Sequence, residues 1–299
     1  MFRSVGVQVV VYHNEQAQLH RLAEGIAATI AQAKEAGVER VSVRFGDCAE
    51  PATIATMEDL LRPELDGVAD NIEFVDFGAN LGSAGGSNSL AAGRDDEVIW
   101  VLNPDTYPSP TCSVELLAAL AQSGVGAVDG RQIPIEHPKD HHPSTGDTSW
   151  ASGACLMFRR EAFDQVGGFD DHFFPMYCDD VDISWRLKLA GWRVVHAPRA
   201  VVFHDKRITV GAGIEVSDFE RMSGTLARLL LTRRYGRPDL EDETLDWIST
   251  DGAEEHRAAA EKFHVRVADG DVPTELPGAI DVAQFIEGEY ALHRFRHTT

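Results

Sequence analysis

Three carboxylates stand close together in the segment 176–186, which reads MYCDDVDISWR. Apolar residues at helical spacing follow them, so we expect a helix with Asp179 as its N-cap and Asp182 in its first turn. Backbone N–H groups and the helix dipole favour negative charge there, so Asp179, Asp180 and Asp182 should be ionised at neutral pH. An ionised carboxylate can act as a metal ligand or a general base. A purely capping role is the alternative that this segment leaves open.

A further carboxylate, Asp105, follows the apolar run 98–102 within the sequence NPDT at 103–106. Hard cations such as Mg²⁺ and Mn²⁺ prefer carboxylate oxygens and commonly bridge to diphosphate oxygens. The same residues also suit an Asx turn at a strand end, with Pro104 shaping the bend.

The segment 80–88, NLGSAGGSN, is a glycine-rich turn that leads into a predicted helix. Such a turn lets the backbone approach a phosphate or ribose closely and presents helix N–H groups. It lacks the G-x-G-x-x-G pattern and follows the third predicted strand rather than the first. Phosphate binding and a structural turn therefore both stay open. His204 ends the run VVFH, and by itself it is typical of a hydrogen-bonded structural group.

Alternating strands and helices position these residues. Apolar runs predict strands at 5–12, 40–45, 71–77 and 98–103, and helical patterns lie between them at 15–36, 51–61 and 85–93. This alternation indicates a parallel α/β sheet with right-handed crossovers. Ligands of such sheets bind beyond the carboxyl ends of the strands, which are all polar in this chain.

The second half is organised differently. We expect a long loop at 132–150, a strand at 155–159, a short helix from Glu161, the acidic helix, and strands near 193–195 and 201–204. Helical patterns follow at 215–235, 253–264 and 281–295, joined by acidic links. The chain thus divides into a catalytic domain, 1–210, and a helical C-terminal extension, 211–299. Apolar residues at helical spacing predict that the extension packs on the chain's own domain or forms a homo-oligomer: Phe219, Met222, Leu226, Leu229 and Leu230.

Composition narrows the function classes. The net charge of -21 argues against nucleic acid as a partner, because an acidic surface repels phosphate backbones. No stretch has the roughly 20 apolar residues needed to span a bilayer, and the N-terminus does not resemble a signal peptide. The four cysteines show no metal spacing, which favours reduced thiols. We expect a cytoplasmic protein, free or peripheral at the inner membrane face.

Taken in order, these features resemble a family. The chain has a valine-rich strand ending in YHN at 12–14, the turn 80–88, NPD at 103–105, WASGACLMFRR at 150–160, GGFD at 167–170, DDVD at 179–182, and a strand ending in His204. Over residues 5–206 this order resembles the family 2 inverting glycosyltransferases, and most of all their bacterial rhamnosyltransferase-type branch. The resemblance implies an α/β fold of the GT-A type, with a Rossmann-like, mainly parallel sheet flanked by helices.

The resemblance also implies roles for individual residues. Asp180 matches the catalytic base, with Asp179 where the family usually has Glu, and Asp105 and His204 match the metal site. The residues matching the donor nucleotide-sugar site are Tyr12, Asn14, Asp47, Asn80, Gly82, Asn88, Asn103 and Asp105. Trp150 and Gly153 fall where the acceptor is expected.

Two positions depart from the family pattern. Asn103 replaces the first Asp of the metal motif. The segment 44–48, RFGDC, replaces the usual Asp-Asn-x-Ser and leaves only Asp47 as a candidate contact to the nucleotide base.

The function implied is an inverting, metal-dependent glycosyltransferase that uses Mn²⁺ or Mg²⁺. The donor would be a nucleotide-diphosphate sugar, dTDP-rhamnose first and a UDP-sugar second, and the acceptor a glycan, a lipid-linked sugar or a small molecule. A sugar-1-phosphate nucleotidyltransferase is disfavoured, because the segment 12–16, YHNEQ, lacks a basic glycine-rich loop. A non-catalytic protein that binds sugar nucleotides or glycans on the same fold is the second alternative.

Overall fold

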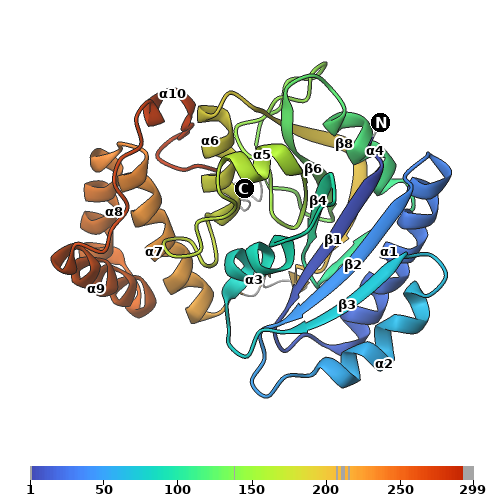
Figure 1. Ribbon diagram of the computed structural model, residues 1–299. Helices are drawn as coiled ribbons and strands as arrows, with labels where there is room; N and C mark the ends of the chain where they lie inside the picture. The colour runs from blue at the N-terminus through green and yellow to red at the C-terminus, as the bar shows by residue number, and fades with distance from the viewer. Residues whose placement is uncertain (1, 138, 207, 210–212, 215, 292–299) are drawn as a thin grey trace.

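The computed structural model describes residues 2–137, 139–206, 208–209, 213–214 and 216–291 (Figure 1). Its N-terminal half alternates strands and helices as the sequence predicts: β1 Ser4–Val11, α1 Gln16–Glu35, β2 Arg40–Asp47, α2 Ile54–Leu65, β3 Asn71–Asp76, α3 Gly82–Ala91 and β4 Val98–Leu102. The four strands are parallel, in the order β3-β2-β1-β4. Their carboxyl ends therefore meet at one edge of the sheet.

Four further strands, two of them antiparallel to the first four, extend this sheet to eight strands. The chain continues through β5 Thr106–Pro108, α4 Cys112–Leu120, β6 Val125–Ile133, β7 Cys155–Arg159, α5 Arg160–Gln165, α6 Asp179–Leu189 and β8 Arg193–His204. The strand β7 pairs antiparallel with both β4 and β6, and β8 lies between β6 and β5. The two strands expected at 193–195 and 201–204 are one long strand, whose pairing with β6 shifts register at Gly130 and Arg131.

Two apolar layers cover the sheet. The larger core cluster packs α1, α2 and α4 on one face, through side chains such as Leu22, Leu61 and Leu116. The second cluster packs α3, α5 and α6 on the other face, with Phe163 and Ile183 among its buried residues. The sheet therefore lies between two helical layers, as expected for a mainly parallel sheet flanked by helices (Figure 1).

The C-terminal part is helical and packs on α6. It contains the short strands β9 Ile208–Thr209 and β10 Gly213–Ile214, then α7 Asp218–Arg234, α8 Pro238–Asp251, α9 Glu254–Asp269 and α10 Ala279–Val282. Leu229 and Leu230 are fully buried in a third core cluster with Trp185 of α6. The expected packing on the chain's own domain is thus confirmed for these leucines, whereas Phe219 is exposed. The predicted boundary at 210/211 lies outside the described residues.

Two predictions about this part are wrong. The acidic stretch after Pro238 is the helix α8 rather than a solvated link, because Pro238 starts the helix and Glu241 pairs with Arg233 at 2.9 Å. Only residues 279–282 are helical at the C-terminal end; 283–291 are not, and 292–295 lie outside the described residues. Within the described part of the chain, no helix is long and apolar enough to cross a bilayer.

Candidate functional site

The acidic segment lies at the start of α6, but not as predicted. The N-cap is Cys178, in the left-handed conformation with φ of 57°, and Asp179 is the first helical residue. The capping role expected of Asp179 is therefore wrong. Its Oδ2 instead accepts a hydrogen bond from Ser83 Oγ at 2.9 Å. Asp179 thus ties α6 to the first turn of α3.

Asp180 faces the backbone at Gly153. Its Oδ2 accepts a hydrogen bond from Gly153 N at 2.8 Å, and its Oδ1 accepts one from Val181 N at 2.9 Å. A β-carbon at position 153 would lie in ordinary van der Waals contact with Asp180, 3.6 Å from its Oδ2. The structure therefore brings together two residues that the sequence predicts for the catalytic and acceptor sites.

Burial changes the protonation expected for these carboxylates. It raises the pKa of Asp179 to about 7, and the neighbouring charge of Asp180 adds to the effect. Burial also raises the pKa of Asp180, although the Gly153 N–H and the charge of Lys139 oppose it. The expectation of ordinary, fully ionised carboxylates is thus wrong for this pair, because desolvation outweighs the stabilisation at the helix start.

Asp182 has a structural environment. It is fully buried, and it accepts hydrogen bonds from Arg186 Nε at 2.7 Å and Arg234 Nη1 at 2.9 Å. The hydroxyl of Tyr235 donates to it as well, at 3.0 Å. Because Arg234 and Tyr235 belong to the end of α7, this carboxylate joins the acidic helix to the C-terminal helices.

Asp105 and His204 come together, as the resemblance implies. The pairing of β5 with β8 sets Thr106 opposite His204, which brings His204 Nε2 to 3.3 Å from Asp105 Oδ1. Burial raises the pKa of Asp105, but the hydrogen bond and positive charge of His204 outweigh it, so the pKa is lowered. The carboxylate is therefore ionised and 28% exposed, as a ligand for a cation requires.

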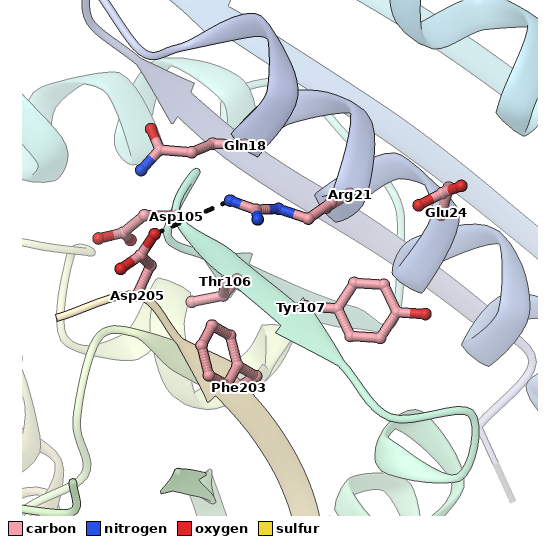
Figure 2. A pocket seen from close by; sticks show the side chains of 8 residues that line it. All are labelled: Gln18, Arg21, Glu24, Asp105, Thr106, Tyr107, Phe203 and Asp205. Carbon is pink, nitrogen blue, oxygen red and sulfur yellow. Dashed lines mark ion pairs between the residues drawn. The ribbon is translucent and has the colours of Figure 1, made fainter. Parts of the chain in front are cut away.

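A cavity of about 310 Å³ lies beside Asp105, between α1 and β5. Figure 2 shows Arg21 reaching from α1 toward Asp205, with Nη2 to Oδ2 at 3.8 Å. The other lining residues are Gln18, Glu24, Thr106, Tyr107 and Phe203. This wall combines charged groups with two exposed aromatic rings.

Three predicted donor residues lie at the ends of β1 and β2. Tyr12 is exposed, and its N–H donates to Asn14 Oδ1 at 3.0 Å, so both lie on the open strand end. Asp47 is fully buried, and its carboxylate accepts hydrogen bonds from Ala49 N and from the N–H and hydroxyl of Thr53. These bonds hold Asp47 in the turn before α2, and its contact to a nucleotide base stays a prediction.

The glycine-rich turn packs against the loop that precedes the acidic helix. Asn80 Oδ1 accepts from Gly82 N at 3.1 Å, and Gly82 adopts φ of 68° where a side chain would collide with the carbonyl of Pro175. Asn88 donates to and accepts from the backbone of Phe169, both at 2.9 Å. Gly82 and Asn88 thus hold this loop, which favours the structural reading of the turn over donor contact.

Trp150 is fully buried, so its ring is not exposed to an acceptor sugar. Its indole N–H donates to the carbonyl of Tyr290 at 3.1 Å, and Lys139 Nζ lies 4.7 Å from the ring centre. The acceptor contact predicted for Trp150 would therefore have to be indirect, because the C-terminal segment covers the ring. Asn103 stays at the strand end, where its N–H donates to Ala154 O at 3.1 Å.

Sequence reasoning missed a buried polar network on β6. Asp129 forms an ion pair with Lys139, accepts from Ser152 N at 2.7 Å and contacts His196 Nδ1 at 2.9 Å. Gln132 belongs to the same network, because its side chain contacts both His204 and Ser152. The signal was the polar pair of Asp129 and Gln132 within the run VGAVDGRQI at 125–133, for which no strand was predicted; the predicted loop at 132–150 overlaps only its last two residues.

Metal-ligating side chains also gather elsewhere. In the described ranges, a group of three with ligand atoms within 4.8 Å of one another occurs only at His20, Glu24 and Glu64, on α1 and α2. Asp105 and His204 therefore offer two protein ligands rather than a closed set of three.

Comparisons with known proteins agree with this fold. The model of the glycosyl transferase family group 2 matches residues 137–215. The N-acetylglucosaminyl-diphospho-decaprenol L-rhamnosyltransferase of Mycobacterium tuberculosis is 51% identical over 119 residues, which are 37% of each chain. The rhamnosyltransferase WbbL of Escherichia coli is 37% identical over 67 residues, 22% of this chain and 25% of that one. The chain thus aligns with little more than a third of the length of the first relative and a quarter of the second.

Solved structures cover more of the chain at lower identity. The mannosyltransferase PcManGT of Pyrobaculum calidifontis, in complex with GDP-Man and Mn²⁺, has a TM-score of 0.55 at 17% identity and covers 93% of this chain and 78% of that one. GalNAc-T7 with UDP, GalNAc and Mn²⁺ has a TM-score of 0.61 at 11% identity, covering 91% and 55%. These likenesses establish the GT-A fold. The family model over residues 137–215 and the rhamnosyltransferase relatives show in addition that the chain resembles the family 2 glycosyltransferases, and among them the rhamnosyltransferases.

Proposed function

We propose that this protein is an inverting glycosyltransferase that moves a sugar from a nucleotide-diphosphate donor to an acceptor hydroxyl. The observation that carries the proposal is the pairing of β4 with β7. It sets Leu102 opposite Cys155 and joins Asn103 N to Ala154 O. Asp105, just after β4, and Gly153, just before β7 and bonded to Asp180, therefore lie at the same end of two paired strands.

In the proposed reaction Asp180 is the general base. Its carboxylate takes the proton of the acceptor hydroxyl as the oxygen attacks the anomeric carbon. The bond from that carbon to the diphosphate oxygen breaks on the opposite face, so the configuration inverts in one displacement. The Gly153 N–H fixes one carboxylate oxygen. The raised pKa of Asp180 makes it a stronger base than an ordinary carboxylate.

We further propose that Asp105 and His204 hold a divalent cation. One carboxylate oxygen and one imidazole nitrogen, 3.3 Å apart, form a mixed donor pair that suits Mn²⁺ or Mg²⁺. With these two ligands from the described residues, other positions on the cation would be available to diphosphate oxygens and water. When bound, such a cation would neutralise charge on the leaving diphosphate. The Mn²⁺ in both structural neighbours supports this assignment.

The relatives guide the choice of substrates. Because the mycobacterial relative is named as an L-rhamnosyltransferase of a diphospho-decaprenol sugar, we propose dTDP-rhamnose as the first donor to test. UDP-sugars come second. A lipid-linked acceptor would place the reaction at the cytoplasmic face of a membrane. A glycan or small-molecule acceptor would not require the protein to reach a membrane.

The test is donor turnover by the purified chain. We expect release of nucleoside diphosphate from dTDP-rhamnose or a UDP-sugar, lost with chelator and restored by Mn²⁺ or Mg²⁺, and a product of inverted anomeric configuration by NMR. Donor binding without turnover on any acceptor would favour a non-catalytic binding protein. Formation of a nucleotide sugar from a sugar-1-phosphate and a nucleoside triphosphate would favour the nucleotidyltransferase alternative.

A further inference from the structure

Gln132 of β6 is fully buried between the two halves of the proposed site. Its side-chain oxygen lies 2.7 Å from Nδ1 of His204, and its side-chain nitrogen donates to Ser152 Oγ at 2.8 Å. Both partners are also buried. One side chain thus contacts the imidazole beside Asp105 and the residue next to Gly153.

The chemistry of this contact determines which imidazole nitrogen faces Asp105. A carboxamide oxygen can only accept a hydrogen bond, so the contact to Gln132 requires a proton on Nδ1 of His204. The other nitrogen, Nε2, then points at Asp105 Oδ1, 3.3 Å away. A metal-ligating histidine commonly donates its second N–H to such an acceptor, which fixes the ring and its tautomer.

The nitrogen end of Gln132 reaches the proposed base through a short path. Ser152 accepts the amide N–H on its hydroxyl, and its own backbone N–H donates to Asp129 at 2.7 Å. The next N–H along the chain, that of Gly153, donates to Asp180 at 2.8 Å. Gln132 therefore fixes the segment that holds Asp180 as well as the ring that faces Asp105.

We propose that Gln132 is a positioning residue that presents His204 Nε2 to a divalent cation shared with Asp105. The amide nitrogen, bound to Ser152, keeps the amide oxygen turned toward the imidazole. The proposal rests on the metal site of the proposed function. The family relationship alone does not assign this residue.

The test is the affinity for Mn²⁺, measured by electron paramagnetic resonance on the full chain with dTDP and, in parallel, UDP. We expect Gln132→Met to weaken Mn²⁺ binding about 10–100-fold, the usual cost of losing an outer-shell partner. Gln132→Glu keeps an acceptor for Nδ1 and should restore affinity to within a few-fold of the wild type. The matched control is Gln165→Met, since Gln165 is exposed and its side-chain oxygen accepts a hydrogen bond from the indole N–H of Trp192.

Two further measurements make the outcomes decisive. Asp105→Asn identifies the Mn²⁺ signal of this site and separates it from ions bound at His20, Glu24 and Glu64. Thermal unfolding shows that each variant is folded. Wild-type affinity in folded Gln132→Met would overturn the inference, as would equal losses in the Met and Glu variants. Sugar transfer by a wild-type chain that binds no Mn²⁺ would overturn the metal site itself and leave the transferase proposal standing.

Discussion

At the scale of single residues, Asp180 is the side chain on which the proposed transfer depends most directly. Asp180→Asn keeps the shape and can still accept from Gly153 N, but it cannot take up the acceptor's proton. Loss of general-base help costs about 10²–10⁴ in rate. We expect kcat to fall by that factor with donor affinity unchanged, as measured by steady-state turnover and donor titration. Normal turnover of this variant would show that another group is the base.

The raised pKa of Asp179 leads to a second prediction, about how the free energy of unfolding depends on pH. Its pKa is raised from 3.8 to about 7, so the folded protein binds more protons than the unfolded chain between these values. The contribution of Asp179 is therefore neutral below about pH 4, becomes unfavourable as pH rises, and is fully unfavourable above about pH 7. Asp179→Asn removes this effect and can still accept from Ser83.

The measurement is the unfolding midpoint at pH 5 and pH 8. Relative to the wild type, Asp179→Asn should gain several °C more at pH 8 than at pH 5, because the unfavourable contribution of the ionised wild-type carboxylate grows between these pH values. Asp239→Asn is a suitable control, because Asp239 is exposed and its pKa is lowered by the hydrogen bond to Arg237. A difference that is the same at both pH values would contradict the raised pKa.

At the scale of elements, α7 is joined to α6 by a buried ion pair. Arg234 donates to Asp182 at 2.9 Å and to Asp170 at 2.5 Å, and its side chain is only 8% exposed. Removing one partner of a buried pair leaves an uncompensated charge and costs about 3–5 kcal/mol. We expect Arg234→Met to lose that much in the free energy of unfolding, measured by urea denaturation.

The neighbouring arginine offers a matched control. Arg233 pairs with Glu241 at 2.9 Å, but its side chain is 33% exposed, so Arg233→Met should cost about 1 kcal/mol or less. Equal losses for the two variants would show that the buried pair is not what joins α7 to α6.

Elements also show how far sequence reasoning reaches. The parallel strands β1 to β4 were predictable because buried parallel strands are continuous apolar runs. The strand β6 was not, since Asp129 and Gln132 interrupt its run and find partners only from β8 and the loop 139–152. The pairing of Asp105 with His204 followed from the family resemblance. The pKa of Asp179 could not follow from sequence, because burial by distant segments sets it.

At the scale of the whole molecule, the C-terminal helices share a core with the proposed site. The ring centroid of Trp185 on α6 lies 4.6 Å from that of Tyr235 and 5.2 Å from that of Phe285. Trp150 donates to the carbonyl of Tyr290. The division at 210/211 stays a prediction, and we propose that the extension does not separate as an independent unit.

Truncation after residue 216 tests this proposal. It would expose the apolar face of α6, including Val181 and Trp185, and leave Asp182 without Arg234. Exposed apolar surface of that kind favours aggregation, and the lost ion pair adds several kcal/mol of instability. We expect an insoluble or unfolded product with no sugar transfer, judged by sedimentation, circular dichroism and turnover. A double variant, Phe219→Ser with Trp247→Gln, tests the alternative that the extension forms a dimer contact. It changes only exposed apolar residues of α7 and α8, so it leaves the core intact. If the double variant alone lowered the molecular mass in solution and the truncated chain remained folded and active, the extension would serve assembly rather than the integrity of the site.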